Sequence, residues 1–528
     1  MESRRMTAAK QTALDWIDAR MGELSDWNQL IWHYGETPWR EYRSARWYVD
    51  RLRTEGFEVE AGSGGMPTAF AAIFCSGPGP VVAGYAEYDG IPGNCQAAST
   101  RLEPRAGLSS HAGGHTDPHS ALGIGALGGF LAAKATMQQH GIGGTLRFFG
   151  ECAEKVRGSK PIHAARGYYN GIDAFISFHP AYTLPLSNTV RWETHCGVAY
   201  SAIYSFHCDE PQTWLSAPSD SPIPQAHTSA RAPGANDALV AMYLLSKMTK
   251  ESMLAFSGAW SMNEAILVAG QATADNLPAQ LAQIQYMLRV AEVEQAETVF
   301  RVLDQNAEAA AKVSHCGWER HWVCKSRPGL ANHAMAEITY GNLALVGSPR
   351  FGAAAVTVAR EIQKNLGLEP MEQPFLDACE TLTDPCEAER KLREVLPPSQ
   401  RYSTSDDYTE MAWHAPTVRL YIGRAMLKAP KNYCYPHWAM NALGGIRATI
   451  DPTIRCAART IAATVLDLLT DRPALAAAKR EFEERTGGGL GGSRWIAPLC
   501  DYAPPIHHRW PEYITTERGT EWWIPTGG

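Results

Sequence analysis

The sequence predicts an α/β fold in which a mostly parallel sheet is interrupted by an inserted two-layer α+β domain. Strands alternate with helices up to about residue 190 and again after about residue 338, a pattern typical of parallel sheets. Between them, residues 191–337 follow the order strand, helix, two strands and helix, which suits a small two-layer domain. The chain of 528 residues is long enough for more than one hydrophobic core.

The elements of the first part are predicted from the spacing of apolar residues. Residues 6–22 and 39–55 have apolar positions at helical spacing. The elements that follow are a buried strand in "GPVVAGYAEYD", a helix over 119–136, the strand "GTLRFFGE", a helix around 160–169 and the strand "AFISFHP".

The later elements divide the chain into four predicted parts. The inserted unit has strands in "ETHCGVAYSAIYSF", "NEAILVAGQA" and "QIQYMLRV", with helices over 235–249 and 292–313. The helix "TIRCAARTIAATVLDLLTD" ends the resumed α/β part, and Gly-rich and Trp/Pro-rich stretches follow it. The parts are 1–190 and 338–473 of a catalytic domain, 191–337 of an inserted domain, and a C-terminal extension over 474–528 that we expect to pack on a neighbouring surface.

Composition excludes two classes of partner. The 48 basic and 55 acidic residues give a net charge of −7, and no basic stripe with interleaved aromatics suggests nucleic-acid binding. No segment reaches about 18 uninterrupted apolar residues, and the start lacks an apolar stretch of signal-peptide length. The twelve cysteines are scattered without a C-x-x-C pair. We therefore expect a cytoplasmic protein with neither membrane nor nucleic acid as partner.

Polar residues close several of the predicted strands. "AEYD", "GECAEK" and "FHP" each follow or end a strand of the first part. The carboxyl ends of parallel strands meet at one edge of a sheet, where active sites are found. These groups are therefore expected to converge on one crevice.

The stretch "GGHTDPHSAL" permits two compatible interpretations. Thr116 or Asp117 could be the N-cap of the following helix, with Pro118 in the first helical position. The same stretch places two histidines and an aspartate within five positions, which is typical of a metal site. A carboxylate at a helix N-terminus can serve both roles.

The order of these motifs resembles the zinc-type metallopeptidase and amidohydrolase family that includes aminoacylase and carboxypeptidase G. Within it, the auxin-conjugate hydrolase and aminobenzoyl-glutamate hydrolase branches are most similar. The resemblance covers roughly residues 10–470 and rests on seven motifs. They are "AEYDGIPG", "HAGGHTDPHSALG", "ECAEK", "FHP", "AHTSARAPGANDAL", "STSDDYTEMAW" and "YPHW".

The resemblance implies a metallohydrolase catalytic domain whose inserted domain acts as a lid and dimerises. It implies that His115, Asp117, His179 and His437 bind a divalent ion, Zn²⁺ or Mn²⁺. Asp89, His119 and Glu87 are then reserve ligands or lie behind the metal.

Two departures from the family concern the number of metal ions. Gly113 and Gly114 stand where the family has a bridging cysteine, and Lys155 stands where it has a second ligand glutamate. A protonated lysine cannot bind a cation and repels one nearby. We therefore expect one metal ion per subunit.

The remaining roles also follow from the resemblance. Glu154 is the predicted general base, and His227 is predicted to stabilise the oxyanion from the partner subunit. Asn276 and Arg289 are predicted to contact a substrate carboxylate. A homodimer or higher homo-oligomer, formed through the inserted domain, is the implied assembly.

The leading functional prediction is hydrolysis of an amide C–N bond in an aromatic or acyl amino-acid conjugate, a small-molecule substrate. One alternative is a hydrolytic deaminase that removes an amino group from an activated aromatic ring, which the same machinery could perform. The other is a non-catalytic scaffold of the same fold, favoured by Gly113 and Lys155 but opposed by the presence of His115, Glu154, His179 and His437.

Overall fold

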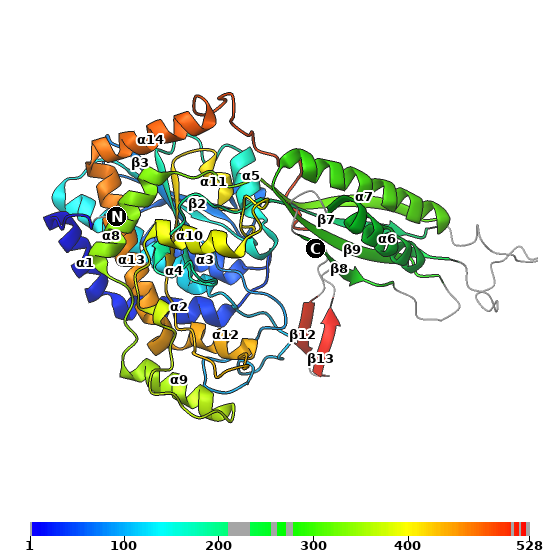
Figure 1. Ribbon diagram of the computed structural model, residues 1–528, viewed down its shortest axis with the longest axis horizontal. Coiled ribbons are helices and arrows are strands. Elements are labelled where there is room, and N and C mark those ends of the chain that lie inside the picture. The colour runs from blue at the N-terminus through cyan, green and yellow to red at the C-terminus, as the bar shows by residue number, and fades with distance from the viewer. Residues whose placement is uncertain are drawn as a thin grey trace, which may run out of the picture.

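The computed structural model consists of a large α/β body and a smaller elongated domain that projects from it (Figure 1). It describes residues 3–209, 233–254, 261–270, 278–507, 512–516 and 519–523. Each body has its own hydrophobic core. The prediction of a mostly parallel α/β domain with a separate inserted α+β domain is confirmed.

The large body is built on a seven-stranded sheet with the order β1-β2-β4-β3-β5-β11-β6. Its centre is parallel, since β4, β3, β5 and β11 run in the same direction. The antiparallel strands β1, β2 and β6 lie outside this centre and were not predicted. The strands are β1 (Glu58–Ala61), β2 (Phe70–Cys75), β3 (Val81–Ala86), β4 (Thr145–Gly150), β5 (Ala174–Pro180), β6 (Thr189–Val190) and β11 (Thr417–Ile422).

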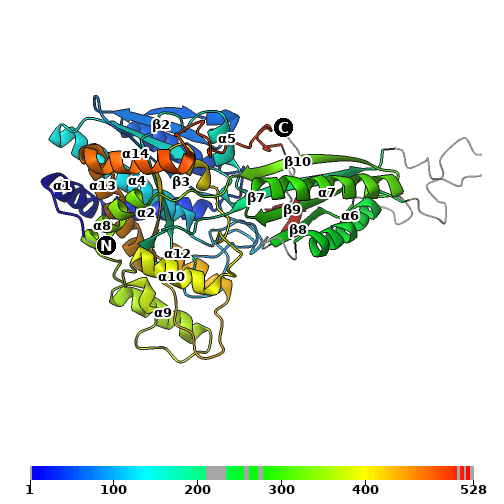
Figure 2. The same ribbon diagram turned by 45° about the horizontal axis from the view of Figure 1, so that its top comes forward.

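Helices cover both faces of this sheet (Figure 2). The region predicted as one helix over 6–22 is divided, because α1 ends at Ala19 and α2 begins at Met21. The helices of the large body are α1 (Ala8–Ala19), α2 (Met21–Tyr34), α3 (Tyr42–Thr54), α4 (His119–His140), α5 (Ser159–Ala165), α8 (His333–Val346), α9 (Ala353–Asn365), α10 (Pro385–Val395), α11 (Thr409–Ala412), α12 (His437–Gly445), α13 (Arg447–Thr470) and α14 (Arg472–Thr486).

The long helix α4 is the central helix of the core and carries the site at its N-terminus. It packs against α13 at close range, because a Cβ at Gly129 would lie 2.7 Å from Cγ2 of Ile461. By length and composition α4 could cross a membrane, but 89% of its most apolar window is buried in the protein. It is therefore a core helix, and its rigid packing fixes the direction in which its first residue points.

The smaller domain has a four-stranded antiparallel sheet with the order β10-β7-β9-β8 and two helices on one face (Figure 2). Buried and half-buried residues alternate along β9, as expected for a sheet with one covered face. The strand β10 was not predicted, because charged residues interrupt its apolar pattern. The elements are β7 (Val198–His207), α6 (Ala235–Thr249), β8 (Ser261–Val268), β9 (Leu281–Val290), α7 (Val293–Val313) and β10 (Gly317–Ser326).

Residues 487–507, the C-terminal strap, run along both bodies. The Trp495 indole N–H donates to the Trp413 carbonyl of the large body at 2.6 Å. The Lys325 ammonium at the end of β10 lies 3.0 Å from Asp501. The strap therefore packs on the inserted domain and the catalytic domain together, and the strands β12 (Glu512–Thr516) and β13 (Gly519–Trp523) follow it.

Candidate active site

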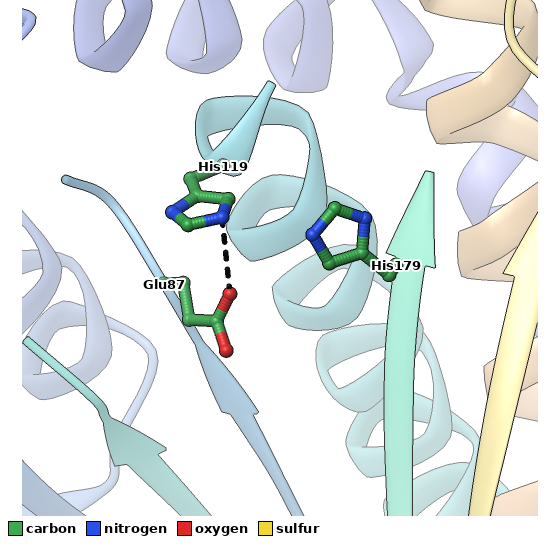
Figure 3. Close-up of side chains that lie close together, drawn as sticks. All are labelled: Glu87, His119 and His179. Atoms are coloured by element: carbon green, nitrogen blue, oxygen red, sulfur yellow. Dashed lines mark ion pairs between the residues drawn. The ribbon is translucent and has the colours of Figure 1, made fainter. Parts of the chain in front are cut away.

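Six polar side chains converge at the carboxyl ends of the parallel strands. This central cluster draws on the chain after β3, the start of α4, the turn after β4 and the end of β5. Its members are Glu87, Asp89, Asp117, His119, Glu154 and His179. Figure 3 shows three of them, with both imidazole rings facing the space beside Glu87.

His119 lies at the middle of the central cluster. Its Nδ1 is 2.7 Å from Asp89 Oδ1, which directs Nε2 toward the other carboxylates. Nε2 lies 3.4 Å from Glu87 Oε2 and 3.5 Å from Glu154 Oε2. Burial and the Lys155 ammonium lower the pKa of His119, but the Glu87 and Asp117 carboxylates raise it to about 10. The surrounding carboxylates therefore favour a positive charge at this position.

His179 presents the second imidazole. Its Nδ1 donates to the Pro180 carbonyl at 2.7 Å, which leaves Nε2 facing the cluster 3.5 Å from Asp117 Oδ2. Burial lowers the pKa of His179, so its ring nitrogen is available as a lone-pair donor.

Glu154 is held in place through its neighbours' peptide groups. The Ala153 N–H donates to the buried Glu41 carboxylate at 2.7 Å, and the Lys155 N–H donates to Asp89 Oδ2 at 2.8 Å. Ala153 has a left-handed backbone with φ of 55°, so these bonds stabilise a turn that is costly for alanine. The Glu154 side chain is thereby fixed next to His119.

Lys155 contributes a positive charge to the same cluster. Its ammonium contacts the Asp117 carboxylate directly and lies 3.2 Å from His119 Nε2. Burial favours the neutral acid, but the Lys155 ammonium lowers the pKa of Asp117 well below its usual value. Asp117 is therefore an anion that already has one cationic partner.

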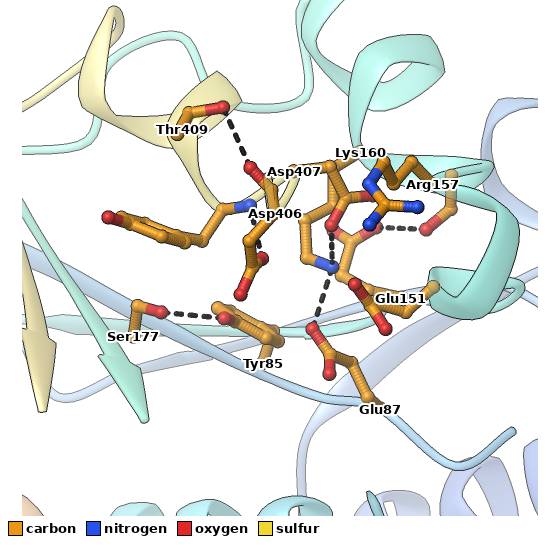
Figure 4. Close-up of polar contacts among 12 residues, drawn as sticks. Tyr85, Glu87, Glu151, Arg157, Lys160, Ser177, Asp406, Asp407 and Thr409 are labelled. Carbon is orange, nitrogen blue, oxygen red and sulfur yellow. Dashed lines mark hydrogen bonds and ion pairs between the residues drawn. The ribbon is translucent and has the colours of Figure 1, made fainter. Parts of the chain in front are cut away.

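A second set of buried charges lies next to the central cluster (Figure 4). The Lys160 ammonium is 2.7 Å from Glu87 Oε1 and 2.6 Å from Asp407 Oδ1. Asp406, the neighbour of Asp407, pairs with the buried Arg419 guanidinium. Glu154, Asp406 and Asp407 also bring ligand atoms within reach of one another. The motif "STSDDYTEMAW" was recognised, but sequence reasoning assigned no role to these aspartates.

Two of the four predicted metal ligands lie outside the central cluster. His115 is buried, and its Nε2 is 3.3 Å from the Ile31 carbonyl of α2. Burial, and then the nearby charge of His119, lower the pKa of His115 to about 3. His437 is exposed at the first position of α12 and belongs to none of the metal-binding groups among the described residues. His119, predicted as a reserve ligand, takes the central position instead.

His119 rather than His115 lies in the central cluster because of the residue at which α4 begins. The helix starts at His119 with Pro118 as its N-cap, so the prediction that Thr116 or Asp117 caps it is wrong. The first helical residue faces the ends of β3 and β5, whereas His115 lies in the preceding loop. Asp117, His179, Glu154, Asp89 and Glu87 are brought together as the motifs indicated.

The predicted residues of the inserted domain have different outcomes. His227 and Asn276 lie outside the described residues. Arg289, on β9, donates from Nε to Ser405 Oγ of the catalytic domain at 2.8 Å. Arg289 therefore reaches the edge of the same site.

Comparison with known proteins agrees with this architecture. No family model matches the chain. It is 24% identical to a p-aminobenzoyl-glutamate hydrolase chain of Escherichia coli over 484 residues, which are 89% of this chain and 94% of that protein. The predicted family resemblance is confirmed. Thermostable carboxypeptidase 1 of Saccharolobus solfataricus is 33% identical over 173 residues, 31% of this chain and 41% of that protein.

A solved structure supports the fold in the same way. The crystal structure of an aminobenzoyl-glutamate utilization protein from Klebsiella pneumoniae has a TM-score of 0.50 and 13% identity. The region in which the two structures match covers 84% of this chain and 98% of the Klebsiella chain. The curated relatives are a hydrolase and carboxypeptidases, and the predicted enzyme class, an amidohydrolase, is confirmed.

Proposed function

We propose that the chain hydrolyses the amide C–N bond of an aromatic or acyl amino-acid conjugate, with Glu154 as general base and a bound divalent ion. The observation that supports this proposal best is the central cluster itself. Two imidazoles and four carboxylates meet at the carboxyl ends of parallel strands, where α/β enzymes bind their substrates. The substrate bond is also suggested by the relative named as a p-aminobenzoyl-glutamate hydrolase.

The donor set fits a divalent ion such as Zn²⁺ or Mn²⁺. Glu87, His119 and His179 bring one oxygen and two nitrogens within reach of one another, and a bound cation would take the place of the proton on His119 Nε2. Glu87 Oε2 is buried, has no hydrogen bond in the described part of the chain and has His119 Nε2 as its ion-pair partner at 3.4 Å, so a cation bound between these two groups would be stabilised. An ion bound here would polarise the substrate carbonyl and acidify a water molecule. We propose one ion per subunit, because the Lys155 ammonium already neutralises Asp117.

Other side chains of the site are proposed to transfer the proton, position the base and pair with the buried charges. Glu154 accepts a proton from the attacking water and returns it to the leaving nitrogen. Glu41 and Asp89, which bind the peptide groups beside Glu154, keep its carboxylate in position for both transfers. The Lys160 ammonium pairs with Glu87 and Asp407 and favours their ionised forms, whereas burial raises the pKa of both carboxyls, that of Glu87 to about 7.

We also propose a homodimer formed through the inserted domain. Val240, Leu244 and Met248 form a stripe on α6 with exposed fractions of 55%, 58% and 59%. On the edge strand β8 of the same domain, Ile266 is 51% exposed. An apolar helix stripe beside an open sheet edge is suited to pairing with a second copy about a two-fold axis.

A cytoplasmic location is proposed because the cysteines in the described residues form no disulfide.

The test is to offer the metal-loaded enzyme N-acyl and N-aroyl amino acids, including N-benzoyl-glutamate, beside activated aminoarenes, and to identify the products by mass. A carboxylic acid plus a free amine is the expected result. A phenol plus ammonia, without amide turnover, would establish ring deamination instead. No turnover of either class by protein with bound metal would favour the scaffold.

A further inference from the structure

Arg105 is a buried arginine in an otherwise exposed stretch of the loop between β3 and α4. Residues 101–104 and 106–108 are exposed, whereas Arg105 is 4% exposed because its side chain turns into the protein. Its Nη2 donates to the Gly113 carbonyl at 2.7 Å, but Nε and Nη1 are buried without a hydrogen-bond partner in the described part of the chain. No carboxylate of the described residues pairs with this guanidinium. A buried charge without a counter-ion is costly, so an anion bound here would be stabilised.

Trp32 of α2 presents a second unpaired donor at the same place. It is 4% exposed, and its indole Nε1 is buried without a hydrogen-bond partner among the described residues. The Arg105 Cζ lies 5.9 Å from the centre of the Trp32 ring. Both side chains line one cavity of about 460 Å³, which lies between α2 and residues 97–106. A guanidinium and an indole N–H in one cavity are suited to donate to the oxygens of a bound oxyanion.

The rest of the cavity wall is mostly apolar. Its apolar residues include Leu30, Ala97, Ala98 and Ala106. Its acidic residue, Asp26, pairs with Arg447 at 2.7 Å and does not neutralise Arg105. His33 also lines the cavity, and burial, followed by the charges of Arg105 and Arg43, lowers the pKa of His33. The cavity therefore combines a positive electrostatic potential with apolar walls, which suits an anion with a small apolar body.

Close packing against two glycines holds both donors in place. A Cβ at Gly35 would lie 2.7 Å from Nη1 and Nη2 of Arg105, so the guanidinium lies directly on this part of the backbone. Gly35 has a φ of 50°, which favours glycine. A Cβ at Gly445, the last residue of α12, would overlap the indole of Trp32. The donors are thus ordered before a ligand binds, which reduces the entropic cost of binding.

We propose that this cavity, the Arg105 pocket, is a second ligand site that binds the carboxylate of a small apolar acid. The guanidinium fork and the indole N–H donate to the carboxylate, and the apolar wall contacts the body of the acid. None of the six residues of the central cluster lines this pocket. The site therefore goes beyond the proposed function and does not depend on the reaction.

The Arg105 pocket is connected with the central cluster through the chain. Arg105 binds the Gly113 carbonyl, and the loop continues from there to Asp117. A carboxylate that fixes the guanidinium also fixes its bond to Gly113. A ligand in the pocket should therefore stabilise residues 113–117.

The experiment measures binding of benzoate to the metal-loaded protein by calorimetry, in a buffer without carboxylate or phosphate. Benzamide and inorganic phosphate are titrated beside it. We expect a Kd for benzoate of about 1 mM or tighter, and no measurable binding of benzamide. Arg105→Met should weaken the binding of benzoate roughly tenfold or more, and Trp32→Phe, which keeps a ring but removes the N–H, about threefold to tenfold. Arg101→Met, an exposed arginine of the same loop, is the matched control.

The fold of the Arg105 variant can be checked in the same preparation. Because Arg105→Met removes a buried charge that has no counter-ion, its melting temperature without benzoate should be no lower than that of the unmodified protein. Benzoate should raise the melting temperature of the unmodified protein and leave that of Arg105→Met unchanged. A rise of equal size in both proteins would place the bound benzoate elsewhere and overturn the proposal.

Two further measurements separate this pocket from the metal site. His179→Ala removes a proposed metal ligand and should still bind benzoate as the unmodified protein does. Benzoate should slow the backbone hydrogen exchange of residues 113–117 in the unmodified protein but not in Arg105→Met. Undetectable binding of benzoate, equal binding of benzamide, tighter binding of phosphate, or loss of binding in His179→Ala but not in Arg105→Met would each overturn the proposal. Unchanged exchange would refute the connection with residues 113–117.

Discussion

The Lys155 ammonium contacts the Asp117 carboxylate at the edge of the central cluster, 3.2 Å from His119 Nε2. A positive side chain therefore occupies the position beside Asp117 where a cation would be attracted. The charge at this point is supplied by the chain itself, and our proposal of one metal ion per chain rests on the repulsion between this ammonium and a second cation.

Replacing Lys155 should change the metal content. In Lys155→Glu a carboxylate takes the place of the ammonium next to Asp117, so we expect the bound metal to rise from one to two equivalents per chain. Elemental analysis after exhaustive dialysis measures this directly, with the exposed Lys364→Glu as control. Two equivalents already present in the unmodified protein would show that Lys155 does not exclude a second ion.

Loss of the Glu154 carboxylate should abolish most turnover without releasing the metal. Glu154→Gln keeps the size of the side chain but cannot accept a proton, so kcat should fall roughly 10²-fold or more. Steady-state kinetics and metal analysis of the same preparation check both statements, and Glu369→Gln on the surface is the control. Near-normal turnover in Glu154→Gln would remove this residue from the mechanism.

Glu41 should act on catalysis through the position of Glu154. Its carboxylate accepts the Ala153 N–H and the Thr68 hydroxyl, so Glu41→Ala frees the turn that carries Glu154. We expect kcat to fall about tenfold to a hundredfold with little change in KM. Glu41→Gln retains an acceptor oxygen and should recover much of the activity. If both variants lose activity equally, the charge of Glu41 matters rather than its hydrogen bond.

His414 should contribute to acid sensitivity. Burial, and then the charge of Arg327, lower the pKa of His414 to about 3. Between this value and the ordinary value near 6.5, the unfolded chain binds a proton that the folded chain does not, so stability falls as the pH falls through this interval. His414→Gln should therefore lose less melting temperature between about pH 6.5 and pH 4 than the unmodified protein. Thermal unfolding measured across that pH interval tests this prediction. Equal losses of melting temperature in His414→Gln and in the unmodified protein would contradict a role of His414. His140→Gln is the surface control.

The apolar stripe on α6 should control assembly. Leu244→Glu places a charge in the middle of Val240, Leu244 and Met248, and a buried unpaired carboxylate strongly opposes association. Light scattering after size exclusion should show a monomer for this variant and a dimer for the unmodified protein. Val395→Glu changes an exposed apolar residue of the catalytic domain and should remain dimeric. A dimer that persists in Leu244→Glu would place the contact elsewhere.

The sequence carried enough information for the fold and for the general location of the site. Parallel strands were predictable because helices alternate with them, and strand ends are where functional groups gather. The exchange of His115 for His119 was not predictable, because it depends on the residue at which α4 begins. Lys160 and Asp407 are 247 positions apart, and no local spacing indicates such a pair. The strand β10 was missed because its charged positions hide the alternation that marks a strand.

The C-terminal strap is a third connection between the inserted domain and the catalytic domain, beside the two chain segments that precede β7 and follow β10. A domain joined to another by two neighbouring chain segments can rotate about the line through those segments. Here the strap adds contacts away from that line, because Trp495 binds Trp413 of the catalytic domain and Asp501 pairs with Lys325 of the inserted domain. Any wide swing of the inserted domain must first release one of these contacts. The residues that follow α14 thus resist a rotation of the inserted domain away from the catalytic domain.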